Sequence, residues 1–235
     1  MTVIRFVSSS REGAMGIVVR DLAGLGEWSA ASALYRHVFG YDQPEFGISP
    51  RLLAALGENS GSVLGAFDPG GAMVGFCYGF SAVDHGELYH YSQAAVVAPG
   101  AQGTGVGRRL KQAQAATARA TGARTMRWTF DPYALRNAHF NFSVLGATAI
   151  RFLPDYYGDG ASDRLLVSWD LAGPHAVEHE CSTVSAPAGE RTAAPEAADR
   201  TVLRRELIEQ FATGRLVRVE RHDNRAVYTF ERCTP

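Results

Sequence analysis

The sequence predicts an α/β fold of the α+β type, in which helices flank both faces of a mixed β-sheet. Two kinds of apolar pattern alternate along residues 16–172, one with the two-residue period of strands and one with the period of helices. Clusters of Gly, Pro, Asp and Ser separate these segments. In the middle of the chain, a glycine-rich loop joins a long strand to an Ala-rich helix, which is a strand–turn–helix unit of α/β proteins.

The first half of this region contains six expected elements. Gly40 suits the end of a helix, and Ser49-Pro50 suits the beginning of another. Asp68 to Gly71 has the composition of a hairpin turn. The expected elements are a strand over 17–22, a helix over 25–39, a short helix from Pro50, a hairpin of 63–67 with 73–83, and a long strand over 87–97.

The second half continues with helices that end at glycines. Gly122 and Gly146 can each adopt the left-handed conformation that closes a helix. The expected elements are a helix over 107–121, a strand over 125–130, a helix over 135–145, and two strands over 150–153 and 165–169.

Both ends of the chain differ from this central region. Residues 1–15 are polar and Ser-rich, and we expect a flexible leader. Residues 173–199 have almost no large apolar side chains and predict a linker. Residues 200–235 then predict a helix, closed by Gly214, and a hairpin. Because this appendage is too small to bury a core of its own, it should dock on the main domain or on a second subunit, which leaves a homodimer open.

The composition excludes several classes of protein. A formal net charge of −1, with no long basic run, argues against a nucleic-acid partner. No apolar run approaches the ~18 residues that suggest a membrane span, and the N-terminus lacks a secretory apolar region. Cys77, Cys181 and Cys233 are scattered without metal-ligand spacing. We therefore expect a cytoplasmic protein without a metal site or a disulfide framework.

The stretch from Ala98 to Lys111 predicts an anion site. Its glycines allow a tight turn, and the helix that follows presents unpaired N–H groups and the positive end of its dipole. Such a point attracts a phosphate or diphosphate. A dinucleotide fingerprint fails because its third glycine would be Arg108, and no Gly-Lys-Ser/Thr run follows. The pattern that fits is Q-x-x-G-x-G, formed by Gln102, Gly105 and Gly107.

At this loop the sequence resembles the GNAT superfamily of acyl-CoA-dependent N-acyltransferases. WTFDPYALRNAHFNFSVLGA at 128–147, YYG at 156–158, SDRLLVSW at 162–169 and the tail at 200–232 are similar to a bacterial branch of that superfamily. The resemblance implies that the loop holds the diphosphate of coenzyme A and that the preceding strand pairs with its pantetheine arm. The residues that it implies at the cofactor are Ala95, Val96, Val97, Gln102, Gly103, Thr104, Gly105, Val106, Gly107, Arg108 and Asn137.

Amine attack on a thioester requires a group that accepts the amine's proton. In several GNAT enzymes this base lies nine or eleven residues before the loop's Gln or Arg, which gives Gln93 and Tyr91 here. Gln93 cannot act as a base, and Tyr91 would need its ordinary pKa of about 10 lowered substantially. A water relay from Glu87 is the alternative. Strand alternation predicts that these three residues share one face with Tyr89 and Ala95.

The two remaining tasks are stabilisation of the oxyanion and protonation of the thiolate. We expect a backbone N–H near 95–97 to serve the oxyanion. The resemblance places the general acid at Phe142, which has no proton to donate. Tyr133, His139, Tyr156 or Tyr157 could substitute, or the thiolate leaves unaided and positioning carries more of the rate.

The leading hypothesis is an enzyme that transfers an acyl group, acetyl or succinyl, from coenzyme A to a small-molecule amine such as an amino acid. The departures at Tyr91, Gln93 and Phe142 leave open a non-catalytic acyl-CoA-binding module. In a third hypothesis the acyl donor is an aminoacyl-tRNA or a carrier protein, although the near-neutral net charge of the chain disfavours tRNA.

Overall fold

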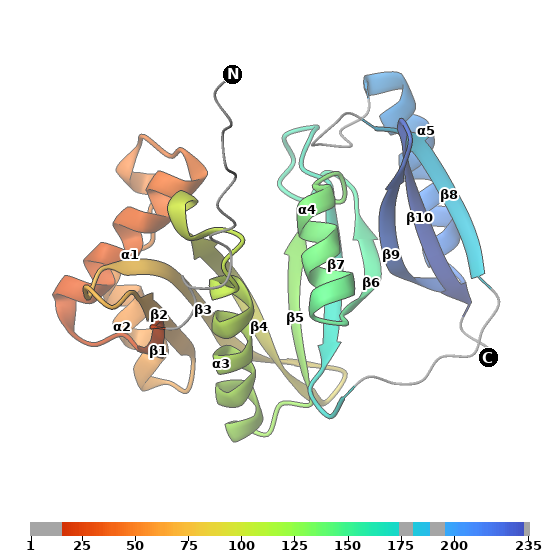
Figure 1. Ribbon diagram of the computed structural model, residues 1–235. Coiled ribbons are helices and arrows are strands. Elements are labelled where there is room, and N and C mark those ends of the chain that lie inside the picture. Colours follow the sequence, from red (N-terminus) through yellow and green to blue (C-terminus); the bar gives the residue numbers. More distant parts are fainter. Residues whose placement is uncertain (1–15, 174–180, 189–195, 233–235) are drawn as a thin grey trace, which may run out of the picture. The chain divides into compact units, whose positions relative to one another are not determined.

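The computed structural model describes residues 16–173, 181–188 and 196–232, and the chain divides into two compact units, Met1–Ala123 and Arg124–Pro235 (Figure 1). The leader expected over 1–15 lies outside the described residues. The unit boundary falls between a helix and a strand of the predicted main domain, so the two halves of that domain are described separately.

The first unit is an antiparallel sheet in the order β1-β2-β3-β4 with helices packed on it (Figure 1). The structure confirms each helix and strand predicted for this part of the chain. Most of their ends differ from the predicted ones by one or two residues. The elements are β1 (Val18–Asp21), α1 (Gly24–Phe39), η1 (Pro44–Phe46), α2 (Pro50–Glu58), β2 (Ser62–Phe67), β3 (Met73–Asp84), β4 (Glu87–Val97), η2 (Pro99–Ala101) and α3 (Val106–Ala120).

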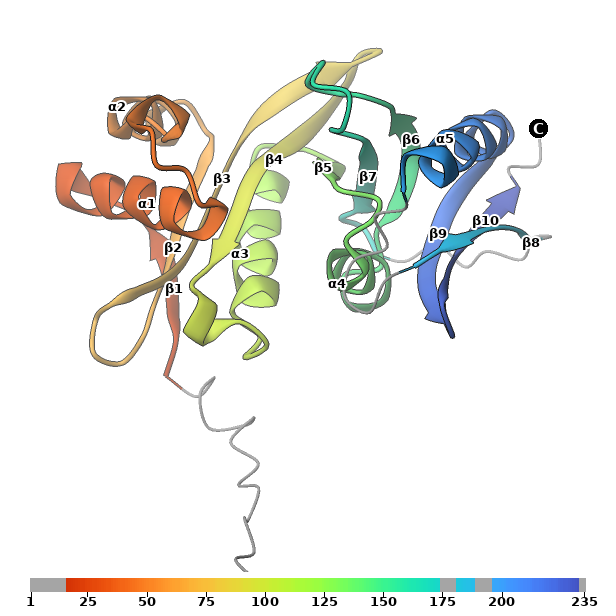
Figure 2. The same cartoon turned by 90° about the horizontal axis from the view of Figure 1, so that it is seen from above.

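The two faces of this sheet carry separate apolar cores. Phe76 and Tyr78 of β3 pack with Leu53 of α2 in one cluster, which α1 also joins. Cys77, between them, points the other way and packs with Leu110 of α3. Figure 2 shows the result, with α1 and α2 on one side of the strands and α3 on the other. The two-residue period of β3 therefore decides which helix each side chain meets.

A β-bulge interrupts β4 in its middle. Tyr78 lies opposite Ala94, whereas the next residue, Gly79, lies opposite Ser92, so the register passes over Gln93. One extra residue reverses the face on which all later side chains point. Val96 thus faces the α1 and α2 core together with Phe76, its partner on β3.

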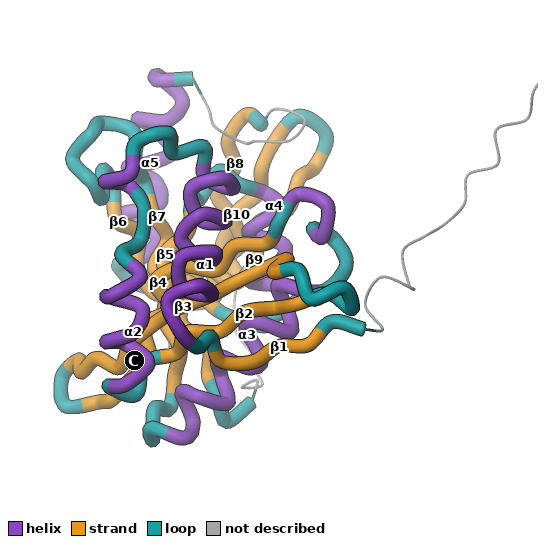
Figure 3. The backbone as a smooth tube through the Cα atoms, turned by 90° about the vertical axis from the view of Figure 1, so that its left-hand side faces the viewer, coloured by secondary structure: helices purple, strands orange, loops and turns teal. Residues whose placement is uncertain are grey.

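The second unit is a sheet in the order β5-β7-β6-β9-β10-β8 (strands orange in Figure 3). The C-terminal segment extends this sheet, because Leu216 of β9 pairs with Ala149 of β6. The elements are β5 (Thr125–Phe130), α4 (Leu135–Ala138), η3 (His139–Val144), β6 (Thr148–Leu153), β7 (Arg164–Asp170), β8 (Cys181–Pro187), α5 (Ala197–Phe211), β9 (Gly214–His222) and β10 (Arg225–Arg232).

The prediction of a linker over 173–199 was wrong for two parts of that range. Cys181–Pro187 forms β8, which pairs along its whole length with β10, and α5 begins at Ala197. Val184 and Ala186 are buried opposite Tyr228 and Ala226, so β8 contributes small inward side chains to a core made by its neighbours. A strand of this kind needs backbone pairing more than large apolar residues of its own.

The helix expected over 135–145 is α-helical only in its first turn, and it continues as the π-helical segment η3. Gly146 closes it with a φ of 72°, as predicted. The buried Asn141 accepts the indole N–H of Trp128 at 3.1 Å, and its carbonyl accepts the N–H of Ala147 at 3.0 Å. These two bonds hold the wider turn and give the Trp and Asn of the motif at 128–147 a structural role.

Candidate functional site

The glycine-rich loop turns through two left-handed residues. Gly103 has a φ of 83° and Gly105 a φ of 89°, which side chains with a Cβ rarely adopt. Two side-chain bonds brace the turn: Gln102 Nε2 donates to the carbonyl of Val97 at 3.1 Å, and Thr104 Oγ1 donates to that of Ala101 at 2.7 Å. Gln102 and Thr104 therefore shape the loop that the glycines bend.

Helix α3 begins directly after this turn, at Val106. Its N-cap residue is Gly105, which supplies no side-chain acceptor to the first N–H groups of the helix. A Cβ at Gly103 or Gly105 would meet nothing within 4 Å, so the loop surface is open at both positions. Arg108 is exposed in the first turn, and Gly107 is half-buried. The donor set, the dipole and the open surface suit a diphosphate.

Arg109 has a different task from Arg108. Its Nη1 donates to the carbonyl of Ile17 at 2.9 Å, which ties the beginning of α3 to the chain before β1. Arg108, which the sequence analysis predicted at the cofactor, is exposed, whereas Arg109 is engaged with Ile17.

The residues expected beside the pantetheine arm lie at the end of β4. Ala95 is exposed, Val97 is half-buried and Val96 is 2% exposed within the α1 and α2 core. All three pair regularly with β3, so the irregularity of β4 lies at Gln93 and not over 95–97, where we expected it. The side chain of Val96 is part of the core, which leaves its backbone as the part that could meet a ligand.

The expected shared face of 87–95 holds for Glu87, Tyr89 and Tyr91 and was wrong from the bulge onward. Because the bulge adds one residue, Ala95 points toward α3, together with Ser92, and not with Tyr91. Tyr91 is half-buried on the opposite face, with its ring 5.5 Å from that of Phe80. Gln93 is exposed at the bulge itself.

Glu87 is not brought together with the bulge. It stands opposite Asp84 at the hairpin end of β4. Gln93 lies six positions further along the strand, which at ~3.3 Å per residue is about 20 Å. The candidate that remains beside the bulge is Tyr91.

A buried polar cluster lies between α3 and the sheet, and the sequence reasoning missed it. Lys111 Nζ donates to Ser92 Oγ at 2.7 Å, and Gln114 Nε2 donates to Ser62 Oγ at 2.8 Å. Ser62 Oγ also lies 2.8 Å from His90 Nε2. All five side chains are at most 3% exposed. The ring of His90 is therefore structural, on the face of β4 opposite Tyr91.

Burial dominates the electrostatics of this cluster. It lowers the pKa of Lys111 to about 7, and it lowers that of His90 to about 4, with a smaller contribution from the charge of Lys111. It raises the pKa of the Cys77 thiol to about 12. At neutral pH the histidine and the thiol are neutral, and Lys111 is the group of this cluster that titrates.

In the second unit, Tyr133 belongs to a buried latch and is not a free proton donor. We define this latch as Tyr133, Asp163 and Arg204. The hydroxyl of Tyr133 donates to Asp163 Oδ2 at 2.5 Å, and Arg204 of α5 donates to the same carboxylate through Nε at 2.8 Å. Burial, and then the bond to Asp163, raises the pKa of Tyr133 far above its ordinary range. Among the other candidate acids, Tyr156, Tyr157 and His139 are exposed.

Two further predicted positions lie in this unit. Phe142 is buried, with its ring 5.8 Å from that of Phe130, so it belongs to the core. Asn137 is exposed on α4, and its role at the cofactor stays a prediction. Within the described residues, no three or more His, Cys, Asp or Glu side chains are grouped to hold a metal. No helix in the described part of the chain is long and apolar enough to cross a membrane.

Comparison with known proteins gives the family and the fold. Residues 28–142 match the model of the acetyltransferase (GNAT) family. Among curated proteins, none matches the chain significantly. Solved structures do: the ribosomal-protein-S18-alanine N-acetyltransferase of Escherichia coli is 18% identical, with a TM-score of 0.52 over 69% of this chain and 97% of that one.

Two other structures show the same likeness. Naa20 of Chaetomium thermophilum, in complex with a bisubstrate analogue, is 18% identical, with a TM-score of 0.54 over 65% of this chain and 86% of that one. Ard1 of Thermoplasma volcanium is 16% identical, with a TM-score of 0.53 over 66% of this chain and 97% of that one. The likeness confirms the predicted fold class, a mixed sheet flanked by helices.

Proposed function

The chain belongs to the GNAT superfamily, whose members transfer acyl groups from coenzyme A to amines, and from this premise we propose its reaction. The protein transfers an acetyl or succinyl group from coenzyme A to the amine of a small molecule, such as an amino acid. A cytoplasmic setting is part of this proposal, since the three cysteines of the chain follow no disulfide pattern.

The observation that carries the proposal is the turn before α3. Gly103 and Gly105 adopt left-handed conformations, and the helix that follows has an N-cap without a side-chain acceptor. The N–H groups from Gly105 to Arg108 would hold the diphosphate, and the Arg108 guanidinium would add a charge-assisted bond. Gln102 would keep the turn in place through its bond to the Val97 carbonyl.

The bulge of β4 is the proposed place where the thioester of acyl-CoA reacts with the amine. Acyl-CoA brings the acyl group as a thioester. The bulge leaves Gln93 outside the regular pairing of β4 with β3, and a backbone N–H at such a position can donate to the developing oxyanion. Tyr91, two residues before the bulge, is the side chain proposed to accept or relay the proton of the attacking amine. Positioning of the amine contributes the rest of the acceleration.

Calorimetry and a thiol-release assay test this proposal together. We expect acetyl-CoA or succinyl-CoA to bind the folded protein, and free thiol to appear when a suitable amine from a panel of amino acids and small amines is added. Absence of binding to both thioesters would reject the proposal. Binding without turnover across a wide panel would favour an acyl-CoA-binding module instead.

Replacing Tyr91 by phenylalanine should lower kcat by at least tenfold and leave KM for the acyl-CoA nearly unchanged, because it removes only the hydroxyl that handles the proton. The matched control is Tyr89→Phe, a half-buried tyrosine two residues earlier on the same strand. Steady-state kinetics over a range of pH provides the measurement. Equal kcat values for the two variants would show that the Tyr91 hydroxyl takes no part in the proton transfer.

A further inference from the structure

One face of the β3–β4 hairpin changes from covered to open at Phe80. Phe76, Tyr78 and Phe80 alternate along β3 and therefore point to the same face, on which α1 and α2 pack. The exposed fraction rises along this row from 0% at Phe76 to 8% at Tyr78 and 36% at Phe80. Figure 2 shows the hairpin continuing beyond both helices. The cover that the helices give to this face thus ends between Tyr78 and Phe80.

The open part of the face begins with two aromatic rings in contact. Phe80 lies opposite Tyr91 of β4, and the ring centroids are 5.5 Å apart with 42° between the ring planes. We call this pair the aromatic platform. The same face continues toward the turn of the hairpin with Ala82, Asp84, Glu87 and Tyr89. The aromatic platform is therefore the part of the open face that lies next to the helices.

The aromatic platform adjoins the β-bulge. Tyr78, where the cover ends, is the last residue of β3 before the register passes over Gln93. Gln93 lies two positions from Tyr91, which is about 7 Å along the strand. The proposed reaction places the thioester carbonyl at this bulge. A molecule whose amine reacts there and which extends along the open face would lie on the aromatic platform.

The chemistry of this surface selects among acceptors. Aromatic rings attract one another at centroid separations of about 4.5–7 Å, and the contact contributes more than the apolar area that it buries. Phe80 has no polar atom, so a hydroxyl or carboxylate placed against its ring would lose water without gaining a hydrogen bond. The substituent that fits is an aromatic ring, joined to the amine by a short aliphatic arm.

We propose that Phe80 determines the acceptor specificity, and that the acceptor is an amine with an aromatic ring on a short aliphatic arm. The inference rests on the proposed function, because it requires the thioester at the bulge. The transfer step is the one proposed above. The amine nitrogen bonds to the acyl carbon, the carbon–sulfur bond breaks, the thiolate of coenzyme A leaves, and Tyr91 accepts or relays the proton that the nitrogen loses.

Two matched pairs of acceptors test the preference. The pair of 2-phenylethylamine and ethylamine differs by one phenyl ring, and so does the pair of phenylalanine and alanine. We expect kcat/KM to be at least tenfold higher for the aromatic member of one pair or of both. The pair with the larger values shows whether the ring belongs to a simple amine or to an amino acid. Turnover without preference for the aromatic member in either pair overturns the inference.

Variants of Phe80 assign the preference to this side chain. Phe80→Ala should lower kcat/KM for the aromatic acceptor by about tenfold, because one aromatic contact and its apolar area are lost. It should leave KM for acetyl-CoA and the values for the non-aromatic acceptor near those of the wild type. Phe80→Leu keeps an apolar side chain without the ring, and its aromatic preference should lie between those of the wild type and Phe80→Ala.

The matched control is Val83→Ala. Val83 is also an exposed apolar residue of β3, but it points to the opposite face. Its removal should leave the aromatic preference unchanged. An unchanged preference in Phe80→Ala, or an equal loss in Val83→Ala, overturns the inference. Because Phe80 is partly exposed and lies at the end of the helix cover, both variants are expected to fold.

Calorimetry provides a measurement that needs no turnover. 2-Phenylethylamine and phenylalanine are each titrated into protein saturated with coenzyme A. We expect at least one of them to bind, with a Kd that rises about tenfold in Phe80→Ala and stays unchanged in Val83→Ala. Binding of coenzyme A without binding of either aromatic acceptor, or an affinity that Phe80→Ala leaves unchanged, overturns the inference alone. Absence of coenzyme A and acetyl-CoA binding rejects the proposed function, and the inference with it.

Discussion

Replacing Asp163 by alanine is expected to lower the free energy of unfolding by about 3 kcal/mol, the low end of the cost of breaking a buried ion pair, because Arg204 is 25% exposed. The carboxylate is fully buried and accepts bonds from Tyr133 and Arg204, and Oδ1 also accepts the N–H of Asp155 at 3.0 Å. Its loss would leave the Arg204 guanidinium and the Tyr133 hydroxyl without their shared acceptor. Chemical denaturation at pH 7 measures the change.

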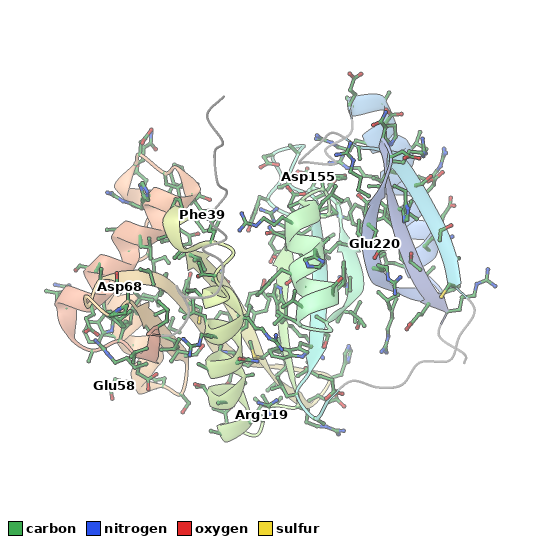
Figure 4. The ribbon with its side chains drawn as sticks, viewed as in Figure 1. Phe39, Glu58, Asp68, Arg119, Asp155 and Glu220 are labelled. Atoms are coloured by element: carbon green, nitrogen blue, oxygen red, sulfur yellow. The ribbon has the colours of Figure 1, made fainter. Side chains whose placement is uncertain are left out.

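The matched control is Glu220→Ala, an exposed carboxylate on β9 whose basic neighbours His222 and Arg218 lie 3.7 and 3.9 Å away (Figure 4). Its effect should stay within about 0.5 kcal/mol. The double variant Asp163→Ala, Arg204→Met should lose less stability than the sum of the single variants, because no charge remains unpaired. Strictly additive losses would show that the latch is not a coupled unit.

Acid should weaken the same latch. Burial alone would raise the pKa of Asp163, but the bonds from Arg204 and Tyr133 outweigh it and keep the pKa below its ordinary value. The carboxylate's contribution to stability is therefore fully present above the ordinary pKa of an aspartate and is lost as the pH falls through the folded value.

Gly105→Ala is expected to weaken acetyl-CoA binding by at least tenfold. A left-handed φ of 89° costs an alanine about 1–2 kcal/mol, and the loop would relieve this strain by turning N–H groups away from their common point. The structure offers a matched control in Gly100→Ala, because Gly100 has no left-handed φ and a Cβ there meets nothing within 4 Å. Calorimetry should give near wild-type affinity for the control. Equal affinities for the two variants would mean that the turn at Gly105 does not shape the site.

The features that the sequence predicted correctly are local ones. The bounds of β4 and β5 follow from runs of apolar alternation between turn residues, and the helix after the loop follows from Gly105 and Gly107. Their signals lie within a few residues, so no tertiary contact was needed to read them.

The missed features depend on partners distant in the chain. The bulge at Gln93 appears only when β4 is paired with β3, since one extra residue leaves no mark on composition. Val184 and Ala186 form a strand because β10 covers them, and Asp163 meets Arg204 from 41 residues away. Lys111 differs from these missed features, because the sequence alone shows that it is the single lysine among 22 arginines.

That single lysine also bears on how the protein tolerates its own reagent. Thioesters acylate exposed lysine amines without any enzyme, and a protein that binds acyl-CoA concentrates one at its surface. Arginine side chains remain protonated and are poor nucleophiles. Because the only lysine is sealed between α3 and β4, an acyl-CoA bound as proposed would meet no exposed lysine side chain. Burial of Lys111 thus keeps the one lysine amine of the chain away from this side reaction.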